Sequence, residues 1–504
     1  MLNDSIVGKI YTLWVQSFCF ALLQRLWRPV RRAFHRSAIL HALFTEGALE
    51  RAYRESGIAA LLRWVCRLVL RILRWFAPVT QAPDTSVAMD LLRGSVLRPL
   101  ARLEGLFGAF VFVMFVVPHA YWNNLYTVLA AFAFLLLYLL LAAAGKRSFL
   151  QPEALGLGAL IFLLSLFLSM GFTAARRDSM RILLFFLASL SMCYFIAASF
   201  REPKRLRQLL AFLYAALLII SLYAIAQNVL GLVEENSSFT DLELNKGVPG
   251  RVYSTLNNPV NLSEFILLFL PLSAAFAAGA KRIWQRVLLA AALVLPAMAL
   301  VLTYSRGGWI AVMLAAAVFT YCCNKRVIPA LLVLGVLAVP MLPESVLIRL
   351  STIGNRKDSS TLHRLYLWQG IARLLADHDR FLTGIGLGPQ TFRMVYPFYA
   401  VGPAKVGAYH SQMHYLELVL ELGLPGLLGF MYMMFKYLGR AGDGIRRHRS
   451  TRLILIACVS SVAALAFVGM VEYIWFYQRI MFAFFIFLGI LLAAAGSTEP
   501  EAIE

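Results

Sequence analysis

The stretch LTYSRGGWIAV, residues 302–312, sets an arginine and two glycines between two long apolar runs. Uncharged windows of about 20 residues recur along the chain, and an α-helix of that length crosses the hydrocarbon core of a bilayer. The chain of 504 residues is 60% hydrophobic and only 14% charged, which is far too apolar for an ordinary soluble domain. Backbone polar groups in lipid must be satisfied internally, so these runs favour helices. The sequence predicts an all-α integral membrane protein.

About twelve transmembrane helices are expected. We predict them at residues 104–121, 124–144, 154–174, 180–199, 208–231, 260–280, 286–304, 308–324, 327–343, 414–437, 452–472 and 475–496. The region before the first span and the loops after the even-numbered spans are basic: GKRS (145–148), REPKRLR (201–207), KRIWQR (281–286), NKR (324–326) and GRAGDGIRRHRSTR (439–452). Lys and Arg gather in cytoplasmic loops, so both termini are predicted to be cytoplasmic. The same rule explains the net charge of +21, and we expect no nucleic-acid partner.

The chain is expected to fall into five parts. These are a basic amphipathic N-terminal region (1–100), spans one to nine (101–343), an extracytoplasmic loop domain (344–413), spans ten to twelve (414–496) and a disordered acidic tail (497–504). In the first part, LLRWVCRLVLRILRWF (61–76) repeats Arg every three or four residues, the pattern of a helix lying against anionic lipid in the cytoplasmic interface. A partner-docking arm is the alternative. The six cysteines have neither metal-like nor disulfide-framework spacing.

The predicted topology places Arg306 at the extracytoplasmic face, because the seventh span runs outward. An arginine there breaks the trend of the basic loops and favours an anionic partner, although a snorkelling side chain is the alternative. Two long loops, about 232–259 and 344–413, lie on the same face, and loops of that length are often functional. The second contains an amphipathic helix, predicted over 359–378, with apolar residues at 362, 365, 368, 371, 372 and 375.

Three stretches on this face combine residues suited to one kind of chemistry. They are KGVPGRVYSTLNNPVNLSEF (246–265), TYSRGGW (303–309) and GAYHSQMHYLELVLELGLPG (407–426). The forked donors of Arg251 and Arg306 suit a diphosphate. His410 or His414 has the pKa range needed to take a proton from an attacking hydroxyl. If the tenth span is already helical at residue 410, the two histidines share one face of it.

The same stretches, together with LTGIGLGPQTF (382–392) and HSQMHYLELVLELGLPGLLGF (410–430), resemble the O-antigen ligase and polymerase superfamily over roughly residues 200–440. The resemblance implies a metal-independent membrane glycosyltransferase of the bacterial inner membrane, with no cofactor. Its donor would be a glycan on undecaprenyl diphosphate, taken at the periplasmic face. A ligase would pass the glycan to lipid A–core or a similar surface acceptor, and a polymerase would pass it to another carrier-linked repeat unit.

Arg251 and Arg306 match the positions of the family's outer arginines. The resemblance therefore implies that these two residues bind the diphosphate. The family's histidine stands before a Tyr-Leu pair, and aligning on Tyr415 and Leu416 sets Gln412 at that position, which is a departure. His410, two residues earlier, is therefore our first choice for the base, with His414 second; a structural role is the alternative for either.

Arg364, in the predicted amphipathic helix, is a further candidate for holding phosphate, with a solvated helix face as its alternative. The Asp-x-Asp in ADHD (376–379) is interpreted as a helix-end turn and GIGLG (384–388) as a tight turn, since neither lies in the context that a metal or dinucleotide site requires. A polyprenyl-glycan transporter remains a more distant alternative, because twelve spans also suit transporters. The sequence decides neither the sugar nor the acceptor.

Overall fold

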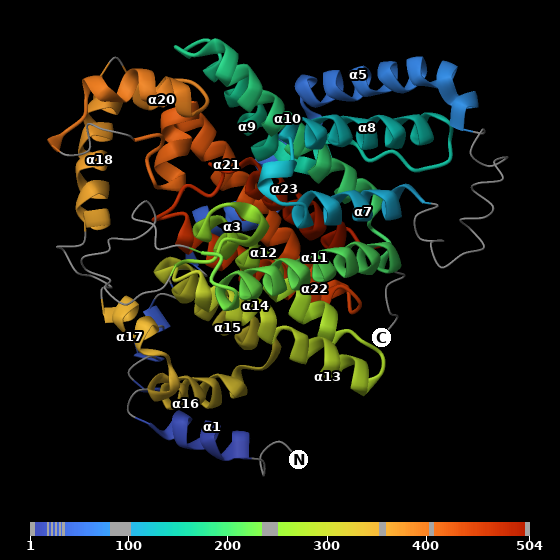
Figure 1. Ribbon diagram of the computed structural model, residues 1–504. Coiled ribbons are helices and arrows are strands. Elements are labelled where there is room, and N and C mark those ends of the chain that lie inside the picture. Colours follow the sequence, from blue (N-terminus) through green and yellow to red (C-terminus); the bar gives the residue numbers. More distant parts are fainter. Residues whose placement is uncertain are drawn as a thin grey trace.

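The computed structural model describes residues 6–80, 102–233, 250–351, 359–402 and 408–498, apart from residue 378 and scattered positions between 18 and 35. These residues form helices joined by short turns, with no strand among them (Figure 1). Within this part of the chain, nine helical segments are long and apolar enough to cross a membrane, and two further apolar helices are shorter. The protein is an all-α integral membrane protein.

The predicted spans coincide with helices of the structure. These are α7 (Leu103–Val116), α8 (Asn124–Ala143), α9 (Gly156–Ser169), α10 (Arg176–Ser199), α11 (Pro203–Val229), α12 (Pro259–Ala278), α13 (Ile283–Ala292) with α14 (Val294–Leu302), α15 (Arg306–Asn324), α16 (Ile328–Ala338), α21 (His414–Arg447), α22 (Arg452–Val468) and α23 (Gln478–Ala495). The ninth is not a full span of its own. Helix α16 has 11 residues, about half of the roughly 20 that a bilayer core requires. It continues from α15 through a short turn and contacts α1 (Ile6–Gln16).

Close helix packing holds the bundle around α23, whose residues are almost all buried. Glycines set the contact between α9 and α21: a Cβ at Gly158 would lie 2.5 Å from the Met433 amide nitrogen, and one at Gly429 would lie 2.8 Å from that of Phe162. Small residues let membrane helices approach to van der Waals contact, the main attraction available between helices in lipid. The bundle therefore depends on the absence of side chains at these positions.

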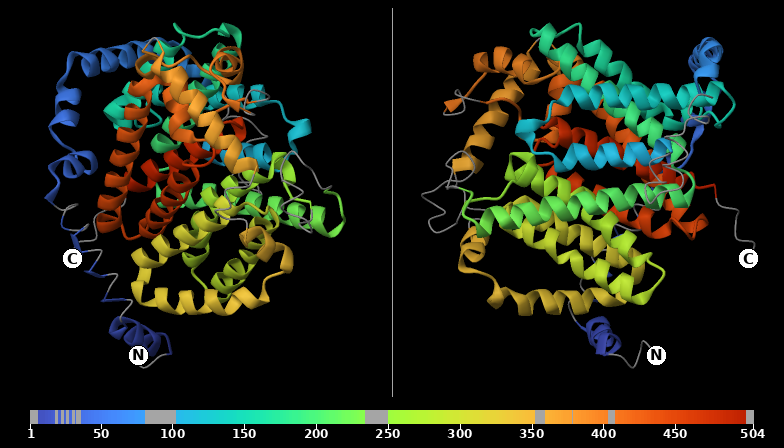
Figure 2. Two further views of the ribbon diagram at one scale, coloured as in Figure 1. Left: turned by 90° about the vertical axis from the view of Figure 1, so that its left-hand side faces the viewer. Right: turned by 45° about the vertical axis from the view of Figure 1, so that its right-hand side comes forward.

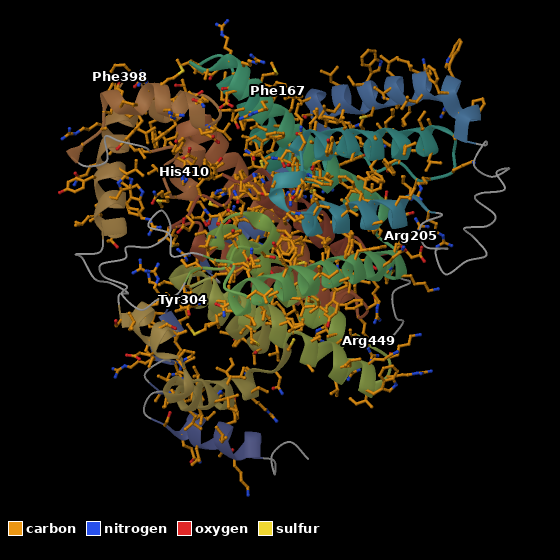
Figure 3. The ribbon with its side chains drawn as sticks, viewed as in Figure 1. Phe167, Arg205, Tyr304, Phe398, His410 and Arg449 are labelled. Atoms are coloured by element: carbon orange, nitrogen blue, oxygen red, sulfur yellow. The ribbon has the colours of Figure 1, made fainter. Side chains whose placement is uncertain are left out.

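The two ends of the bundle differ in charge. At one end, called here the basic end, buried Glu104 lies 2.6 Å from both Arg147 and Arg205, which come from two different basic loops. The other end, called here the α18 end, carries the long loop (Figure 2, right). Figure 3 shows His410 toward the α18 end and Arg205 and Arg449 toward the basic end.

The loop between α16 and α21 folds into a small domain with its own core. Its helices are α17 (Glu344–Ser351), α18 (Ser359–Ala376), α19 (Arg380–Thr383) and α20 (Pro389–Val395). The helix predicted over 359–378 is confirmed as α18. Its predicted apolar face is partly wrong, since Leu362 and Leu365 are 40% and 48% exposed while Leu367 and Leu374 are fully buried. The reason is that α18 packs on protein, against a cluster that includes Phe392.

The N-terminal region adds α3 (Ala38–Phe44), α4 (Ala48–Glu55) and α5 (Gly57–Leu73). Helix α5 confirms the helix predicted over 61–76; it contacts α8, and Arg63 lies 2.7 Å from Glu153. Most of its large apolar side chains stay exposed, including Leu61 and Trp64. Residues 234–249 of the first long loop and 499–504 of the predicted disordered tail lie outside the described residues.

Candidate active site

The turn between α14 and α15 organises the α18 end. Carbonyl groups in the last turn of a helix lack partners within the helix. Here three successive carbonyls accept hydrogen bonds from other parts of the chain: Leu302 from the Val252 amide (3.2 Å), Thr303 from Arg251 Nε (2.7 Å) and Tyr304 from Arg349 Nε (3.2 Å). One end of a helix thereby orients two arginines from distant segments.

The third arginine is the first residue of α15. Ser305 caps this helix by accepting a hydrogen bond from the Gly308 amide at 3.3 Å. A Cβ at Gly308 would lie 2.0 Å from Ser263 Oγ, so glycine is needed for α15 to approach α12. Because a helix N-terminus carries partial positive charge and free amide groups, the start of α15 adds to the charge of Arg306.

The fourth arginine comes from α18. Arg364 donates to Glu472 Oε1 at 2.8 Å and to Gln412 Oε1 at 3.0 Å, and its side chain is only 20% exposed. The alternative of a solvated helix face is therefore wrong for Arg364. Glu472 lies in the short connection between α22 and α23, so this contact joins the loop domain to the end of the bundle.

These four side chains, Arg251, Arg306, Arg349 and Arg364, are called here the arginine cluster. Burial lowers the pKa of Arg251 to about 9; the charges of Arg349 and Arg306 lower it further, while Glu472 opposes them. Burial raises the pKa of Glu472, and Arg364, Arg251 and Arg306 act against that rise. Three guanidinium groups, those of Arg364, Arg251 and Arg306, thus act on Glu472, and Arg349 acts on Arg251. Glu264 of α12 lies buried beside the Glu472 carboxylate.

His410 lies next to this cluster. Its ring is 4.4 Å from that of Phe476 and 5.6 Å from that of Tyr473, measured between centroids. Nδ1 accepts a hydrogen bond from the Gln412 amide at 3.1 Å. Burial, and then the charge of Arg364, lower the pKa of His410 to about 4. The ring is therefore neutral at neutral pH and can accept a proton, but its pKa lies below the near-neutral range that the sequence analysis expected and that suits a general base best.

The loop that carries His410 is held from two sides. The Ser411 amide donates to Glu417 Oε2 at 2.6 Å, and the indole nitrogen of Trp368 donates to the Ser411 carbonyl at 2.9 Å. Gln412 adopts a left-handed φ of 54°, which is costly for a residue with a side chain. Fixed contacts with α21 and α18 thus hold the imidazole in a tightly constrained turn.

His414 has different surroundings. It is 2% exposed, its ring centroid is 4.4 Å from that of Trp475 and 5.4 Å from that of Phe430, and within the described residues neither ring nitrogen has a hydrogen-bond partner. The expected shared helical face is wrong, because α21 begins at His414 and residues 410–413 are not helical. This geometry favours His410 over His414 as the base.

The GIGLG turn fits into a break in α21. Gly423 has a φ of 67° inside that helix, and a Cβ there would lie 2.1 Å from the Leu382 carbonyl oxygen. The break leaves the Leu420 carbonyl open to accept from the Ile385 amide at 2.7 Å, and Glu421 accepts from the Gly388 amide at 2.9 Å. Two motifs that are distant in sequence therefore form one structural unit, and the predicted tight turn is confirmed.

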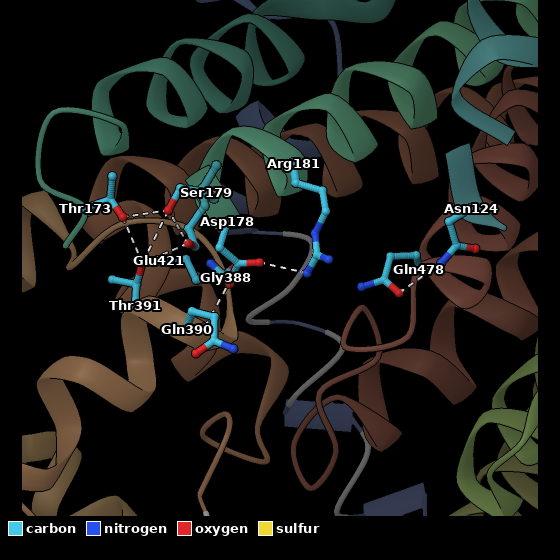
Figure 4. A network of polar contacts seen from close by, with 11 residues as sticks. Asn124, Thr173, Asp178, Ser179, Arg181, Gly388, Gln390, Thr391, Glu421 and Gln478 are labelled. Atoms are coloured by element: carbon cyan, nitrogen blue, oxygen red, sulfur yellow. Dashed lines mark hydrogen bonds and ion pairs between the residues drawn. The ribbon is translucent and has the colours of Figure 1, made fainter. Parts of the chain in front are cut away.

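A polar network ties this turn to the start of α10 (Figure 4). Thr173 Oγ1 is 2.8 Å from Thr391 Oγ1, and Ser179 Oγ donates to the Leu387 carbonyl at 2.5 Å. A narrow pocket of about 20 Å³, with room for little more than one water molecule, lies beside the network, and its lining includes Tyr409, Tyr473, Phe476, Glu417 and Glu421. Since Tyr473 and Phe476 also contact His410, this pocket borders the candidate base.

Among the described residues, no group of three or more His, Cys, Asp or Glu side chains is arranged to hold a metal ion. In the Asp-x-Asp stretch, Asp379 has a left-handed φ of 55° at the start of α19, and the Tyr399 hydroxyl donates to Asp377. The interpretation of ADHD as a turn is confirmed.

Residues 291–431 match the family model of the O-antigen ligases. The chain carries a domain of the O-antigen ligase superfamily. Within this O-antigen ligase domain lie Arg306, Arg349, Arg364 and His410, while Arg251 and Glu472 lie outside it. No curated protein matches the chain.

The structure brings together Arg251, Arg306, Arg364 and His410, as the resemblance to the O-antigen ligase superfamily implied. It adds Arg349 and Glu472, which the sequence analysis missed. A signal for Glu472 existed: it is an acidic residue at the end of the eleventh predicted span, which the predicted topology places on the same face as the arginines. Arg349 carried no such signal, because it stands in a loop among several other charged residues.

Proposed function

We propose that the chain is an O-antigen ligase-like glycosyltransferase of the bacterial inner membrane. It would transfer a glycan from undecaprenyl diphosphate to lipid A–core or a similar surface acceptor, at the extracytoplasmic face, with inversion and without a metal ion. Both termini would be cytoplasmic. The observation that carries this proposal is the meeting of the arginine cluster and His410 at the end of the bundle opposite the basic loops.

The charge of the cluster supports a diphosphate donor. Four arginines face two carboxylates, Glu472 and Glu264, so at least two positive charges are in excess. A diphosphate joined to a lipid and a sugar carries two negative charges. Guanidinium forks hold phosphate oxygens through paired, charge-assisted hydrogen bonds. In transfer, the same groups would stabilise the charge that builds on the departing diphosphate.

His410 supports the role of general base. In the proposed step, the acceptor hydroxyl oxygen attacks the anomeric carbon while His410 takes the hydroxyl proton. The bond from that carbon to the diphosphate oxygen breaks, and undecaprenyl diphosphate leaves with the electron pair.

The hydrogen bond at Nδ1 sets a condition on this step. While the Gln412 amide donates to Nδ1, a neutral His410 ring carries its proton on Nε2, and Nδ1 is its accepting atom. The acceptor hydroxyl would therefore replace the Gln412 amide at Nδ1.

Two alternatives remain beside the ligase. A polymerase would use the same donor chemistry and differ only in its acceptor, another carrier-linked repeat unit. A polyprenyl-glycan transporter is the more distant alternative, since transporters hold their substrate near the middle of the bilayer. The arginine cluster lies instead at one end of the bundle, at the start of α15, before α12 and in helices α17 and α18 of the loop domain.

The experiment is a comparison of Arg306→Ala with Arg177→Ala in a strain that lacks the native gene. Arg177 is an exposed arginine at the α18 end, at the start of α10, so its variant loses the same group outside the cluster. We expect Arg306→Ala to stay in the membrane and lose glycan transfer, while Arg177→Ala keeps it. Full transfer by Arg306→Ala would refute the proposal.

The deletion strain also separates ligase from polymerase. Undecorated lipid A–core together with intact polymer on the carrier would indicate a ligase. Single repeat units on the core would indicate a polymerase. Movement of the carrier-linked glycan across vesicle membranes without any acceptor would favour the transporter.

A further inference from the structure

A second charged pocket lies at the basic end, opposite the arginine cluster. It has an empty volume of about 1160 Å³ and lies where the segment from α3 to α4 meets the ends of α21 and α23. Its charged lining consists of four arginines and two carboxylates: Arg54, Arg201, Arg440, Arg447, Glu46 and Asp443. The proposed transfer reaction uses none of these residues.

Half of the positive charge in this pocket is not balanced by the carboxylates that line it. Glu46 lies 2.5 Å from Arg54 and so pairs with that arginine. Among the carboxylates that line the pocket, Asp443 then remains for the other three arginines, and buried Glu50 lies behind Arg440. Arg201 Nε donates to the Ala197 carbonyl at 3.1 Å, which leaves most of the five donors of that guanidinium for a ligand.

Arg447 is the arginine of this pocket that is most available to a ligand. It is exposed at the last residue of α21, and its side chain makes no hydrogen bond or ion pair with any residue that the structure describes. Arg440, two turns earlier, donates to the Ala154 carbonyl and packs over the ring of Tyr437. One fixed and one available guanidinium therefore stand on the same side of one helix.

The surroundings of the pocket suit a lipid. Leu150, Leu155 and Leu492 form apolar parts of its wall. A neighbouring depression of about 630 Å³ shares Arg54 and also includes Arg63 of α5. Helix α5 leaves Leu61 and Trp64 more than half exposed, as expected for a helix that lies against a bilayer.

We propose that this pocket binds the phosphate of an anionic phospholipid headgroup in the leaflet at the basic end. The arginines hold the phosphate, and the acyl chains lie along apolar helix surfaces beside α5. Basic pockets between helix ends recognise acidic headgroups in this way. A soluble phosphate compound shares the chemistry of the headgroup, but it has no acyl chains to contact the apolar wall and the exposed face of α5.

The test titrates phosphatidylglycerol into the purified full chain in neutral detergent and counts bound lipid by native mass spectrometry. The pocket variant is Arg201→Gln/Arg447→Gln. The matched control is Arg446→Gln/Arg449→Gln, which removes the same charge from two exposed neighbours that do not line the pocket. If the double variant fails to fold, the single variant Arg447→Gln, which changes an exposed residue, replaces it in the titration.

We expect the pocket variant to bind phosphatidylglycerol at least about tenfold more weakly than the parent, since each basic residue near an acidic headgroup contributes about 1 kcal/mol. The control should bind like the parent, and phosphatidylcholine should bind weakly to all. Equal binding by the pocket variant and the control would overturn the proposal. Displacement of the lipid by millimolar inorganic phosphate would overturn the lipid assignment in favour of a small anion. The outcome does not depend on the transfer reaction.

Discussion

At the scale of single residues, we expect the geometry of the guanidinium groups to matter more for diphosphate binding than their charge. Arg251 uses Nε to hold the Thr303 carbonyl, so its two terminal nitrogens stay in a fixed fork. A lysine keeps the charge but cannot make both contacts. We expect Arg251→Lys to lower the transfer rate by about 10- to 100-fold, the effect of losing a hydrogen bond to a charged group. The transfer rate of Arg251→Lys is measured as an initial rate in proteoliposomes. A rate equal to that of the parent would show that the positive charge alone is enough for transfer.

His410 links the site to pH. Burial and the positive charge of Arg364 disfavour the imidazolium and lower the pKa of His410 to about 4. Because kcat/KM follows the base of the free enzyme, it should stay level down to about pH 5 and fall below that.

Removing the charge in Arg364→Gln should stabilise the imidazolium and move this acid limb to higher pH, whatever happens to the absolute rate. The Arg177→Gln variant is the control and should keep the limb of the parent. An acid limb that is the same in all three proteins would contradict the assignment of His410.

At the scale of helices, the break in α21 is sensitive to a single added methyl group. Gly423→Ala adds a Cβ at a φ of 67° and 2.1 Å from a carbonyl oxygen. We expect it to lower the thermal unfolding midpoint by several degrees, since strain of this kind costs about 1–3 kcal/mol. Gly442→Ala in the same helix meets nothing within 4 Å and should be neutral or slightly stabilising, because alanine favours helix. Equal midpoints would contradict the proposed fit.

Hydropathy and charge predict most of the helices and the face on which the arginines meet, because both depend only on local composition. Contacts between segments that are distant in the sequence leave no pattern in local composition. The GIGLG turn lies in the break at Gly423, and no local pattern relates those two positions. Helix α16 is apolar enough to resemble a span, but a turn after α15 and the start of the loop domain at α17 leave it too short. The prediction that His410 and His414 share one helix face assumed that the helix already includes residue 410. It is wrong because α21 starts at His414.

At the scale of the whole molecule, the orientation in the membrane can be tested directly. Phe398 is 84% exposed and lies with His410 at the α18 end, whereas Arg449 lies at the basic end (Figure 3). In a cysteine-free background, Phe398→Cys should react with a membrane-impermeant maleimide from the periplasmic side of intact cells. Arg449→Cys should react only after the inner membrane is opened. The reverse pattern would place the arginine cluster in the cytoplasm.

The central claim is that the arginine cluster binds a lipid diphosphate and that His410 acts afterwards. Equilibrium binding of undecaprenyl diphosphate to the purified chain tests it most directly. We predict that Arg251→Gln and Arg306→Gln lose most of the affinity, whereas Arg177→Gln and His410→Ala bind like the parent, although His410→Ala no longer transfers glycan. Parent-like affinity in both cluster variants would contradict the account.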